Sequence, residues 1–471
     1  MKHIIITILI LGTTLLSFSQ KKCNCEEALN QLIERVESDY PGMKEKTTQK
    51  LIYENFKTGL QNQSKDVKES GCFELLKTYL AYFKDGHIAL QKNNDEEAAP
   101  IEEKDTKVAE KLDVNLKSYK KHILTTTDDL EGIWNSGEYK VGIIKKHDEY
   151  KAFIIESANK AWKTNDVKFC LMKDGKANYF MGDHSAREDE YELYEGAILS
   201  FKNINSVFIK ELPKPKLTEN EIQSKLDEID GFYVKKLTEK TVLICMSSFE
   251  QGYVERIERL IDANIQLIEN CENLIVDVRD NSGGTDNAYQ KLLPYICTNN
   301  MRSLGTEWLA TPTVIKTLQY WIDITPDEEK YLADKKMVTR WIKLFKANVG
   351  KFVNTDSTDV VITEVEIAKK SPEQVVILAN KSSGSSAESF LFHMKQSKKV
   401  KVLGTPTYGA LDYASAYYFE FGCDSYKLLL PAWRARRLPD YPIDNIGVQP
   451  DIYLDKSVKD WVQFAVDYLE N

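Results

Sequence analysis

The spacing of apolar residues changes twice along the chain, and each regime predicts a different kind of structure. From Cys25 to Phe83 the apolar residues recur every three or four positions, which is typical of amphipathic helices. Between about residues 128 and 213 they recur every second position, with Asp174 and Gly175 as a hairpin signal. These consecutive short strands, with no helix between them, predict a small antiparallel sandwich or barrel.

From residue 217 onward, strand patterns alternate with helical patterns, so we expect an α/β region whose sheet is at least partly parallel. A helical insertion is expected at about 314–370. The predicted strands are 240–249, 273–279, 374–380 and 399–404, and the predicted helices are 253–269, 288–296 and 386–396. The predicted domains are a signal peptide (1–20), a helical domain (21–125), a small all-β domain (126–215) and an α/β core (216–471).

The first twenty residues, MKHIIITILILGTTLLSFSQ, have a short basic start, an apolar run from Ile4 to Phe18 and a small, polar end. This layout is typical of a secretory signal peptide, since spanning a bilayer takes roughly 18 to 20 apolar residues. We expect an exported protein, periplasmic or extracellular, without stable membrane insertion after signal removal. Cys23 leaves a lipid anchor open, although Lys21 and Lys22 stand where small residues precede a lipidated cysteine.

The net charge of -9 and the absence of a long basic run argue against a nucleic acid partner. Eight cysteines in an exported chain permit disulfides, and either Cys23 or Cys25 could pair with Cys72. Cys170 and Cys245 lie in apolar strand-like runs, where a buried free thiol is the other interpretation. The CNC triplet has no matching Cys or His cluster at zinc spacing, so no metal site is expected.

The stretch ANKSSGSSAESFLFHMK, residues 379–395, places a turn rich in Gly and Ser between a strand pattern and a helical pattern. A serine in such a turn can be exposed while the amides of the helix N-terminus face the same point, which suits a nucleophile beside an oxyanion site. Ser385 is the candidate. The alternative is an ordinary helix cap, because serine is favoured at the N-cap and Glu388 would complete a capping box.

A second glycine turn, in NLIVDVRDNSGGTDNAYQKLL, follows another buried strand. Gly283 and Gly284 leave backbone amides open to close approach, as an oxyanion hole requires. A tight strand-to-helix turn is the alternative interpretation.

Together these motifs resemble the C-terminal processing peptidase, or tail-specific protease, family of serine peptidases. NLIVDVRDNSGG resembles its aspartate, arginine and diglycine signature, SSAESF its nucleophile turn, KVLGTPTYG the strand and loop after it, and GVQPDI its closing motif. With YPG and DGH near the N-terminus, the resemblance covers most of the chain outside the β region and the helical insertion. It implies an α/β catalytic core (crotonase/ClpP-like), here with an N-terminal helical domain and an inserted small antiparallel β domain.

The resemblance implies that Ser385 is the nucleophile. The family's lysine base would fall at position 410, where this sequence has Ala410. The histidine-dependent branch, which resembles tricorn cores and interphotoreceptor retinoid-binding protein modules, carries a histidine in an N-terminal DGH motif. His87 stands in that motif and is therefore the expected base. The other histidines match no such motif: His3, His122, His147, His184 and His393.

The resemblance also implies an acid that orients the histidine, a glutamate shortly before the glycine of the closing motif. In PIDNIGVQPD this place is held by Asp444, whose side chain is one methylene shorter. Asp440 is the nearest substitute, and Asp451 is expected to order the turn. The expected oxyanion donors are backbone amides, those of Gly283, Gly284 and Ser386.

The stretch WRARRLPDYP is a concentrated basic patch near the proposed site. Arg434, Arg436 and Arg437 could bind the C-terminal carboxylate of a substrate, because arginine binds carboxylates bidentately. A solvated surface run is the alternative interpretation.

The sequence thus predicts an exported serine endopeptidase that acts on proteins or peptides and needs no metal or organic cofactor. Many relatives carry a peptide-binding PDZ domain before the core, whereas the β region stands in that place here. The lost lysine and Asp444 keep a second hypothesis open, a catalytically silent peptide- or ligand-binding protein. A third is an α/β hydrolytic or acyl-transferring enzyme that acts on a small molecule, against which the DGH and GVQPDI motifs speak.

Overall fold

The computed structural model describes residues 24–92, 110–356, 358–421 and 425–471. The predicted signal peptide, Cys23 and most of the charged segment after Lys92 lie outside the described residues. The chain divides into two compact units, one built from Met1–Glu97 together with Val234–Asn471 and the other from Ala98–Tyr233.

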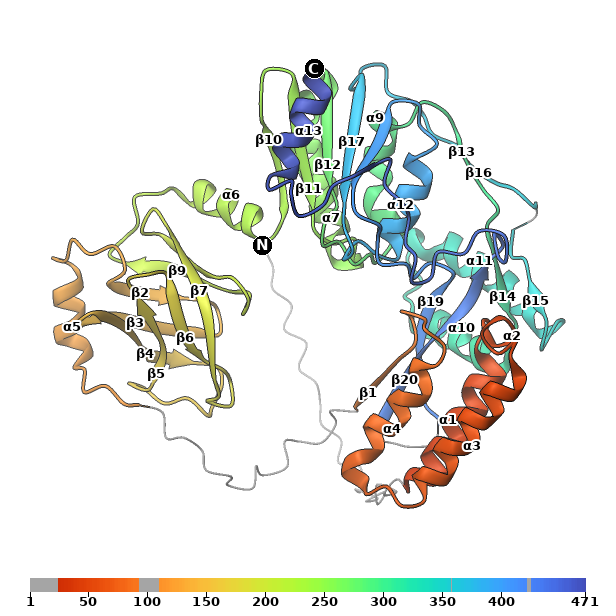
Figure 1. Cartoon of the computed structure of the whole chain (residues 1–471). Coiled ribbons are helices and arrows are strands. Elements are labelled where there is room, and N and C mark those ends of the chain that lie inside the picture. The colour runs from red at the N-terminus through yellow and green to blue at the C-terminus, as the bar shows by residue number, and fades with distance from the viewer. Residues whose placement is uncertain (1–23, 93–109, 357, 422–424) are drawn as a thin grey trace. The chain divides into compact units, whose positions relative to one another are not determined.

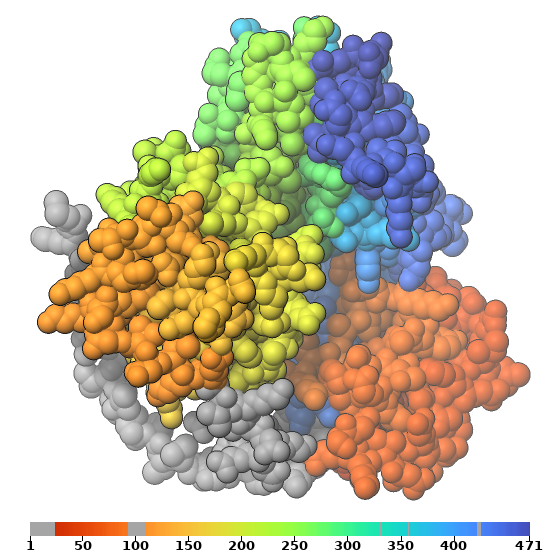
Figure 2. All heavy atoms as spheres, turned by 60° about the vertical axis from the view of Figure 1, so that its left-hand side comes forward, coloured from red at the N-terminus to blue at the C-terminus, as the bar shows by residue number. Residues whose placement is uncertain are grey.

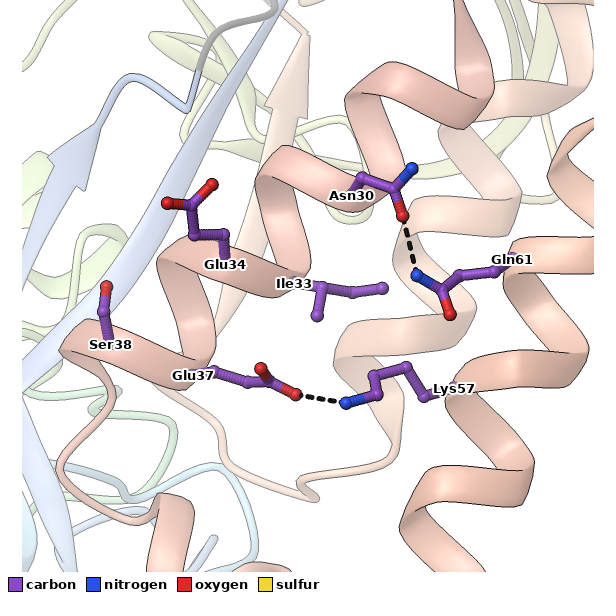
Figure 3. Close-up of a pocket in the computed structure, with 7 residues that line it drawn as sticks. All are labelled: Asn30, Ile33, Glu34, Glu37, Ser38, Lys57 and Gln61. Atoms are coloured by element: carbon purple, nitrogen blue, oxygen red, sulfur yellow. Dashed lines mark hydrogen bonds and ion pairs between the residues drawn. The ribbon is translucent and has the colours of Figure 1, made fainter.

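The N-terminal part of the first unit is helical, as its apolar spacing predicts (Figure 1). Its helices are α1 (Cys25–Asp39), α2 (Met43–Lys46), α3 (Lys50–Ser64) and α4 (Glu69–Ala81). The apolar stripes of α1 and α4 pack into one core, which includes Leu32, Leu76 and Tyr79. On the outer side, polar pairs join α1 to α3 across a shallow pocket: Asn30 to Gln61 at 2.7 Å and Glu37 to Lys57 at 2.8 Å (Figure 3).

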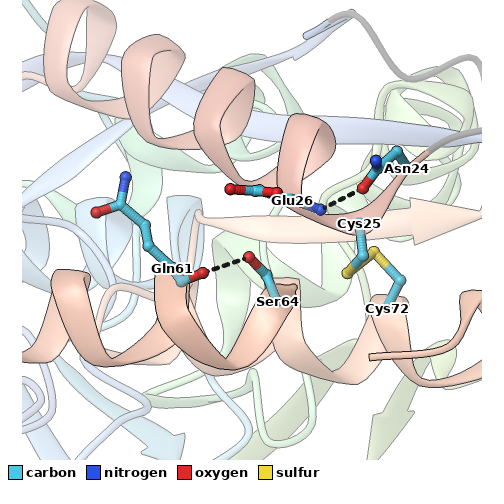
Figure 4. The surroundings of a disulfide bond; sticks show 6 residues. All are labelled: Asn24, Cys25, Glu26, Gln61, Ser64 and Cys72. Atoms are coloured by element: carbon cyan, nitrogen blue, oxygen red, sulfur yellow. Dashed lines mark hydrogen bonds between the residues drawn. A yellow bond between two sulfur atoms is a disulfide. The ribbon is translucent and has the colours of Figure 1, made fainter. Parts of the chain in front are cut away.

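A disulfide between Cys25 and Cys72 ties the start of α1 to α4 (Figure 4). It is one of the two pairings that the sequence leaves open. Cys170, Cys271 and Cys297 are buried thiols.

The helical segment is joined to the C-terminal part of the same unit by a β ladder and a shared core. After α4, strand β1 (Ala89–Lys92) pairs antiparallel with β20 (Tyr426–Ala435), with Ala89 opposite Leu429. Leu428 and Leu430 of β20 belong to the same core as α1 and α4. Figure 2 shows the N-terminal helices (red-orange) lying against later segments of this unit.

β1 and β20 belong to a mixed-origin sheet, called here the second sheet to distinguish it from the parallel main sheet described below. Its order is β1-β20-β14-β15, with β19 also paired to β20. Its other strands are β14 (Thr306–Leu309), β15 (Phe352–Val353) and β19 (Tyr413–Phe419). The apolar spacing did not predict this sheet, because its strands come from four separate stretches and three of them, β1, β14 and β15, have four residues or fewer.

The main sheet confirms the predicted α/β core. Its order is β10-β11-β12-β17-β18-β21, and the pairs from β11 through β21 are parallel. Its strands are β10 (Phe232–Lys236), β11 (Thr241–Met246), β12 (Asn273–Asp277), β17 (Gln374–Ala379), β18 (Val400–Gly404) and β21 (Ile452–Tyr453). The central strands are apolar nearly throughout because helices cover both faces of a parallel sheet.

The connecting helices follow the predicted order with two differences. The predicted helix 253–269 is interrupted at Asn264, so η1 (Gln251–Tyr253) leads into two helices, α7 (Val254–Ala263) and α8 (Ile265–Asn270). The predicted helix 288–296 is a 3₁₀ turn, η2 (Asp286–Leu292), followed by α9 (Leu293–Ile296), because Pro294 cannot donate the hydrogen bond that would continue one helix.

Helix α12 (Ser386–Met394) follows β17 as predicted, and α13 (Trp461–Glu470), which was not predicted, packs on β12 and β17 (Figure 1). The predicted helical insertion is a hairpin of α10 (Pro312–Ile324) and α11 (Glu329–Lys346). Its last part is not helical, since β15 lies there and β16 (Val361–Thr363) pairs with β13 (Met301–Ser303).

The second unit is a closed antiparallel barrel of eight strands, one of the two predicted forms. Its strands are β2 (Gly132–Asn135), β3 (Tyr139–Lys146), β4 (Glu149–Ser157), β5 (Val167–Met172), β6 (Lys176–Phe180), β7 (Ala186–Tyr194), β8 (Ile198–Phe201) and β9 (Ser206–Leu212). Helices α5 (Leu116–Ile123) and α6 (Glu219–Ile229) flank them in sequence. Large side chains such as Trp134, Phe169 and Phe208 fill the barrel, so it is a packed core.

Among the described residues, no helix is long and apolar enough to cross a bilayer.

The disulfide is expected to stabilise the helical segment. Replacing Cys25 and Cys72 together by serine should lower the free energy of unfolding by about 2–4 kcal/mol, because the loop between them is no longer closed in the unfolded chain. Urea unfolding followed by circular dichroism measures this. A reductant should destabilise the wild type by a similar amount and leave the double variant unchanged. Equal unfolding midpoints for both proteins under oxidising conditions would contradict it.

Candidate active site

Ser385 lies at the turn between β17 and α12, in a backbone conformation that few residues adopt. Its φ is 52° and its ψ is -117°, so the residue is held in a strained turn that projects its side chain, as nucleophile turns between a strand and a helix do. Ser383 holds the turn in place: its hydroxyl donates to the carbonyl of Val278 at 2.8 Å and accepts from the amide of Asn380 at 3.0 Å.

His87 reaches this serine from a distant part of the chain. Its Nε2 atom lies 3.1 Å from Oγ of Ser385, although the two residues are 298 positions apart. Asp85 holds the turn that carries His87: one carboxylate oxygen accepts the His87 amide at 2.8 Å, and the other accepts the hydroxyl of Tyr40 at 2.8 Å. The helical segment therefore positions the histidine through the buried Asp85 carboxylate.

Burial is the main cause of the pKa shifts of Asp85 and His87, the two titratable residues of the DGH motif. It raises the pKa of Asp85 to about 6, against the opposing hydrogen bonds from His87 and Tyr40. It lowers the pKa of His87 below its usual value, and this shift is opposed by the backbone at Tyr413 and Ala410 and by the charge of Asp444. His87 is therefore mainly neutral at pH 7, the form that a general base requires.

The Nδ1 atom of His87 is buried and has no hydrogen-bond partner among the described residues. The carboxylate of Asp444 is engaged elsewhere: one oxygen pairs with Nζ of Lys46 at 3.0 Å, and the other accepts the amide of Asp412 at 3.1 Å. Burial, with the charge of Asp85 as the next cause, raises the pKa of Asp444 to about 7, while Lys46 opposes the shift. Asp444 thus acts on His87 through its charge and makes no direct hydrogen bond with it.

Asp440 is exposed, whereas Asp451 orders the closing turn as expected. One carboxylate oxygen of Asp451 accepts the amide of Val402 at 2.8 Å, and the other pairs with Lys395 at 2.5 Å.

Glu388 organises the site more extensively than a helix cap does. Its side chain is fully buried and accepts four hydrogen bonds, from two separate segments. One oxygen accepts the Ser385 amide at 3.1 Å and the Ala410 amide at 3.0 Å. The other accepts the Thr407 hydroxyl and the Gly409 amide, both at 2.6 Å. The sequence pattern finds the cap but not the tie to the 407–410 loop, because those partners lie 19 to 22 positions away.

The two glycines of the other turn differ in what their amides can do. The Gly283 amide donates to Oδ1 of Asn281 at 2.9 Å, so it is already occupied. Among the described residues, no acceptor faces the amides of Gly284 and Ser386. Both glycines are also sterically required: a Cβ at Gly283 would lie 2.7 Å from Cβ of Ser385, and one at Gly284 would lie 2.3 Å from the carbonyl of Phe249. Of the three predicted oxyanion donors, the Gly283 amide is thus the one that already has an acceptor.

A pocket of about 610 Å³ opens beside Ser385. Ser385, Ser386, Ser389, Phe392, His393 and Gln396 line it at helical spacing, so the pocket runs along one face of α12. Leu411, Ala414 and Trp433 supply an apolar wall, and Arg302 lies at the pocket with its guanidinium unpaired among the described residues. Sequence reasoning missed Arg302, since an isolated arginine in a short strand carries no signal.

The three arginines of the basic patch all have carboxylate partners. Arg434 pairs with Glu307 at 2.6 Å and also with Glu45, and Arg436 pairs with Asp359 at 2.7 Å. Arg437 lines the pocket, but its guanidinium pairs with the buried Asp412 at 2.5 Å. Their positive charges are thus largely neutralised within the protein.

The remaining described histidines have other surroundings. His393 lines the pocket and contacts the hydroxyl of Tyr289 at 3.4 Å, and burial lowers its pKa. His122, His147 and His184 belong to the barrel unit.

Comparison with known proteins gives three findings. The model of peptidase family S41 matches residues 240–454, a range that includes Ser385 and Asp444 but not His87. The carboxyl-terminal-processing peptidase 2, chloroplastic, of Arabidopsis thaliana is 23% identical over 246 residues, which are 52% of this chain and 38% of that protein. The chain therefore matches well under half the length of that curated relative.

Among solved structures, mature CPAF resembles this fold with a TM-score of 0.50 and 12% identity, over 95% of this chain and 97% of that one. The likeness extends to the fold alone.

Glu388→Gln is expected to loosen the active-site turn. A glutamine offers one acceptor oxygen where four donors converge, so at least one buried amide loses its acceptor, at a cost of about 2–4 kcal/mol in unfolding free energy. Chemical denaturation measures the loss. Glu255→Gln on the surface of α7, where the side chain is 86% exposed, is the matched control and should change stability by less than about 0.5 kcal/mol. Similar losses in both variants would contradict the role of Glu388.

Proposed function

We propose that this chain is an exported serine endopeptidase of peptidase family S41, in which Ser385 is the nucleophile and His87 the general base. The observation that carries the proposal is the 3.1 Å contact between Nε2 of His87 and Oγ of Ser385 at a strained strand-to-helix turn. Nucleophilic catalysis by a serine needs such a base within hydrogen-bond reach.

In the first step, Oγ of Ser385 forms a bond to the carbonyl carbon of the substrate peptide, and Nε2 of His87 accepts the hydroxyl proton. When the C–N bond of the tetrahedral intermediate breaks, His87 returns this proton to the leaving nitrogen. A water molecule then attacks the acyl-serine with the same base, which releases the acid and regenerates Ser385.

The oxyanion is proposed to be held by the amides of Gly284 and Ser386. Both residues line the pocket beside Ser385, and their amides remain unpaired within the described part of the chain. Removing one such donor typically costs a factor of about 10² to 10³ in rate. The Gly283 amide supports the turn instead, through its bond to Asn281.

Asp444 is proposed to stabilise the imidazolium that forms during the reaction. Its negative charge favours protonated His87, although its hydrogen bonds go to Lys46 and Asp412. In this arrangement the acid acts through the electrostatic field, while Asp85 holds the backbone turn that carries His87. The interaction is strong because both groups are buried.

The pocket along α12 is proposed to receive the acyl side of the substrate. It includes the nucleophile and both oxyanion residues but not His87, and its volume of about 610 Å³ is large enough for a bulky side chain. Arg302 lies at the pocket and has no carboxylate partner in the described part of the chain, so it is better placed than the basic patch to bind a substrate carboxylate. Arg434, Arg436 and Arg437 are each paired with a carboxylate.

Export is supported by the disulfide between Cys25 and Cys72, because such bonds persist in oxidising compartments. A periplasmic or extracellular location is compatible with this bond.

One observation favours a second candidate, a catalytically silent peptide-binding protein. Nδ1 of His87 has no partner within the described chain, and Asp444 is paired with Lys46, so the relay of a complete triad is not formed. The labelling experiment below separates the two.

A fluorophosphonate probe is expected to label Ser385 in the purified protein. Ser385→Ala should abolish labelling, and His87→Ala should slow it by a factor of about 10³ or more, because an unactivated serine is a weak nucleophile. Asp444→Asn should slow it less, since the acid makes no direct bond to the histidine. The measurement is the labelling rate followed by mass spectrometry, with Ser382→Ala as the matched control. A folded wild type that is not labelled would support the silent binding protein.

As the pH is lowered below about 8, kcat/KM should fall in two successive steps. Asp444, with a pKa of about 7, loses its charge first as the pH falls, which removes stabilisation of the imidazolium and lowers the rate. His87 then becomes protonated below its usual pKa and the remaining activity is lost. Asp444→Asn should remove the upper step and retain the lower one. The prediction is wrong if the two proteins give profiles of the same shape.

A further inference from the structure

Tyr408 is a large aromatic residue at the junction of the two turns that carry Ser385 and His87. A Cβ on Gly86, next to His87, would lie 2.6 Å from Cε1 of Tyr408. A Cβ on Gly384, next to Ser385, would lie 3.3 Å from its Cβ. The tyrosine therefore contacts the backbone immediately before each member of the dyad.

The backbone of Tyr408 is fixed, yet its side chain is open to solvent. Its amide donates to the carbonyl of Ser383 at 2.8 Å, and the next two amides donate to the buried Glu388. The side chain nevertheless remains 56% exposed. A single exposed aromatic is common on protein surfaces, but one held rigidly between two catalytic turns presents a fixed apolar wall to anything bound there.

The chemistry of Ser385 and His87 indicates whether Tyr408 lies beside the acyl part or the leaving part of a bound substrate. The base must return its proton to the leaving nitrogen, so the leaving part of the substrate lies on the side of His87. Tyr408 contacts the residue before His87, whereas the pocket beside Ser385 includes neither Tyr408 nor His87 in its lining. The pocket thus faces the acyl part and Tyr408 faces the leaving part.

Resting on the proposed peptidase function, we propose that Tyr408 forms the wall of the subsite for the first residue after the scissile bond, the P1′ residue. The ring favours a large apolar or aromatic P1′ side chain, which can pack against its face. A side chain at Gly86 would collide with the ring of Tyr408, and one at Gly384 would press against its Cβ.

The test is a comparison of kcat/KM for peptides that differ only at P1′, with Phe, Leu, Gly or Asp in that place. This ratio reports the steps up to release of the leaving group, so it is the right measure of a P1′ contact. The wild type should prefer Phe or Leu over Gly and Asp by about tenfold or more. Tyr408→Ala should reduce the preference to about threefold or less, and Tyr408→Phe should retain it.

Two further variants keep the outcome clear. Tyr408→Lys keeps a long side chain over Gly86 and should shift the preference toward Asp, which tests the subsite even if the alanine variant folds poorly. Tyr418→Ala on β19, with a side chain that is 51% exposed and outside the pocket, is the matched control and should retain the wild-type ratio.

Cleavage whose P1′ preference is the same in wild type, Tyr408→Ala and Tyr408→Lys would overturn this inference and leave the peptidase intact. No fluorophosphonate labelling of Ser385 and no cleavage of any peptide would overturn the proposed function and this inference together.

Discussion

The pairing of β1 with β20 is the constraint on which the site depends. It places a four-residue strand that directly follows the DGH motif against a strand of the C-terminal part, so His87 and Ser385 meet across 298 positions of sequence. A four-residue strand supplies few hydrogen bonds, and the shared apolar core of α1, α4 and β20 supplies most of the stabilisation. Because closing so long a loop is entropically costly, the dyad exists only when the helical segment and the core have both folded.

The buried carboxylates arrange the rest of the site around this contact. Glu388 binds the nucleophile turn to the 407–410 loop, and Asp85 binds the histidine turn to Tyr40. Asp412 accepts the amides of Ile443 and Asp444, which sets the position of the closing motif. Each acts as a junction because a carboxylate can accept several hydrogen bonds, and leaving any of the donors unpaired inside the protein is costly. Ser385 and His87, the proposed nucleophile and base, contact each other, and these carboxylates hold the turns that carry them.

Local periodicity predicted most of the fold, and the family resemblance supplied Ser385, His87 and Asp444, while the hydrogen-bond partners of Asp444 and the second sheet needed tertiary information. The helices of residues 25–83 and the barrel strands have apolar residues that recur along the chain, and the central parallel strands are nearly continuous buried runs. β1, β14 and β15 are too short for such a pattern; β1 and β14 pair with β20, and β15 pairs with β14. Likewise, the motif places Asp444 near the histidine, but only the fold shows that Lys46 from α2 takes its hydrogen bond.

The alanine at position 410 is explained by the same packing. Its Cβ lies 3.0 Å from the place where a Cβ on Gly86 would stand, and its amide is bound to Glu388. A lysine here would have to send its chain through the space that the DGH turn occupies. In this chain the space beside the Ala410 side chain is therefore occupied by the DGH turn. With His87 as the proposed base, proton transfer at Ser385 depends on the packing of the N-terminal helices against β20 in their shared core.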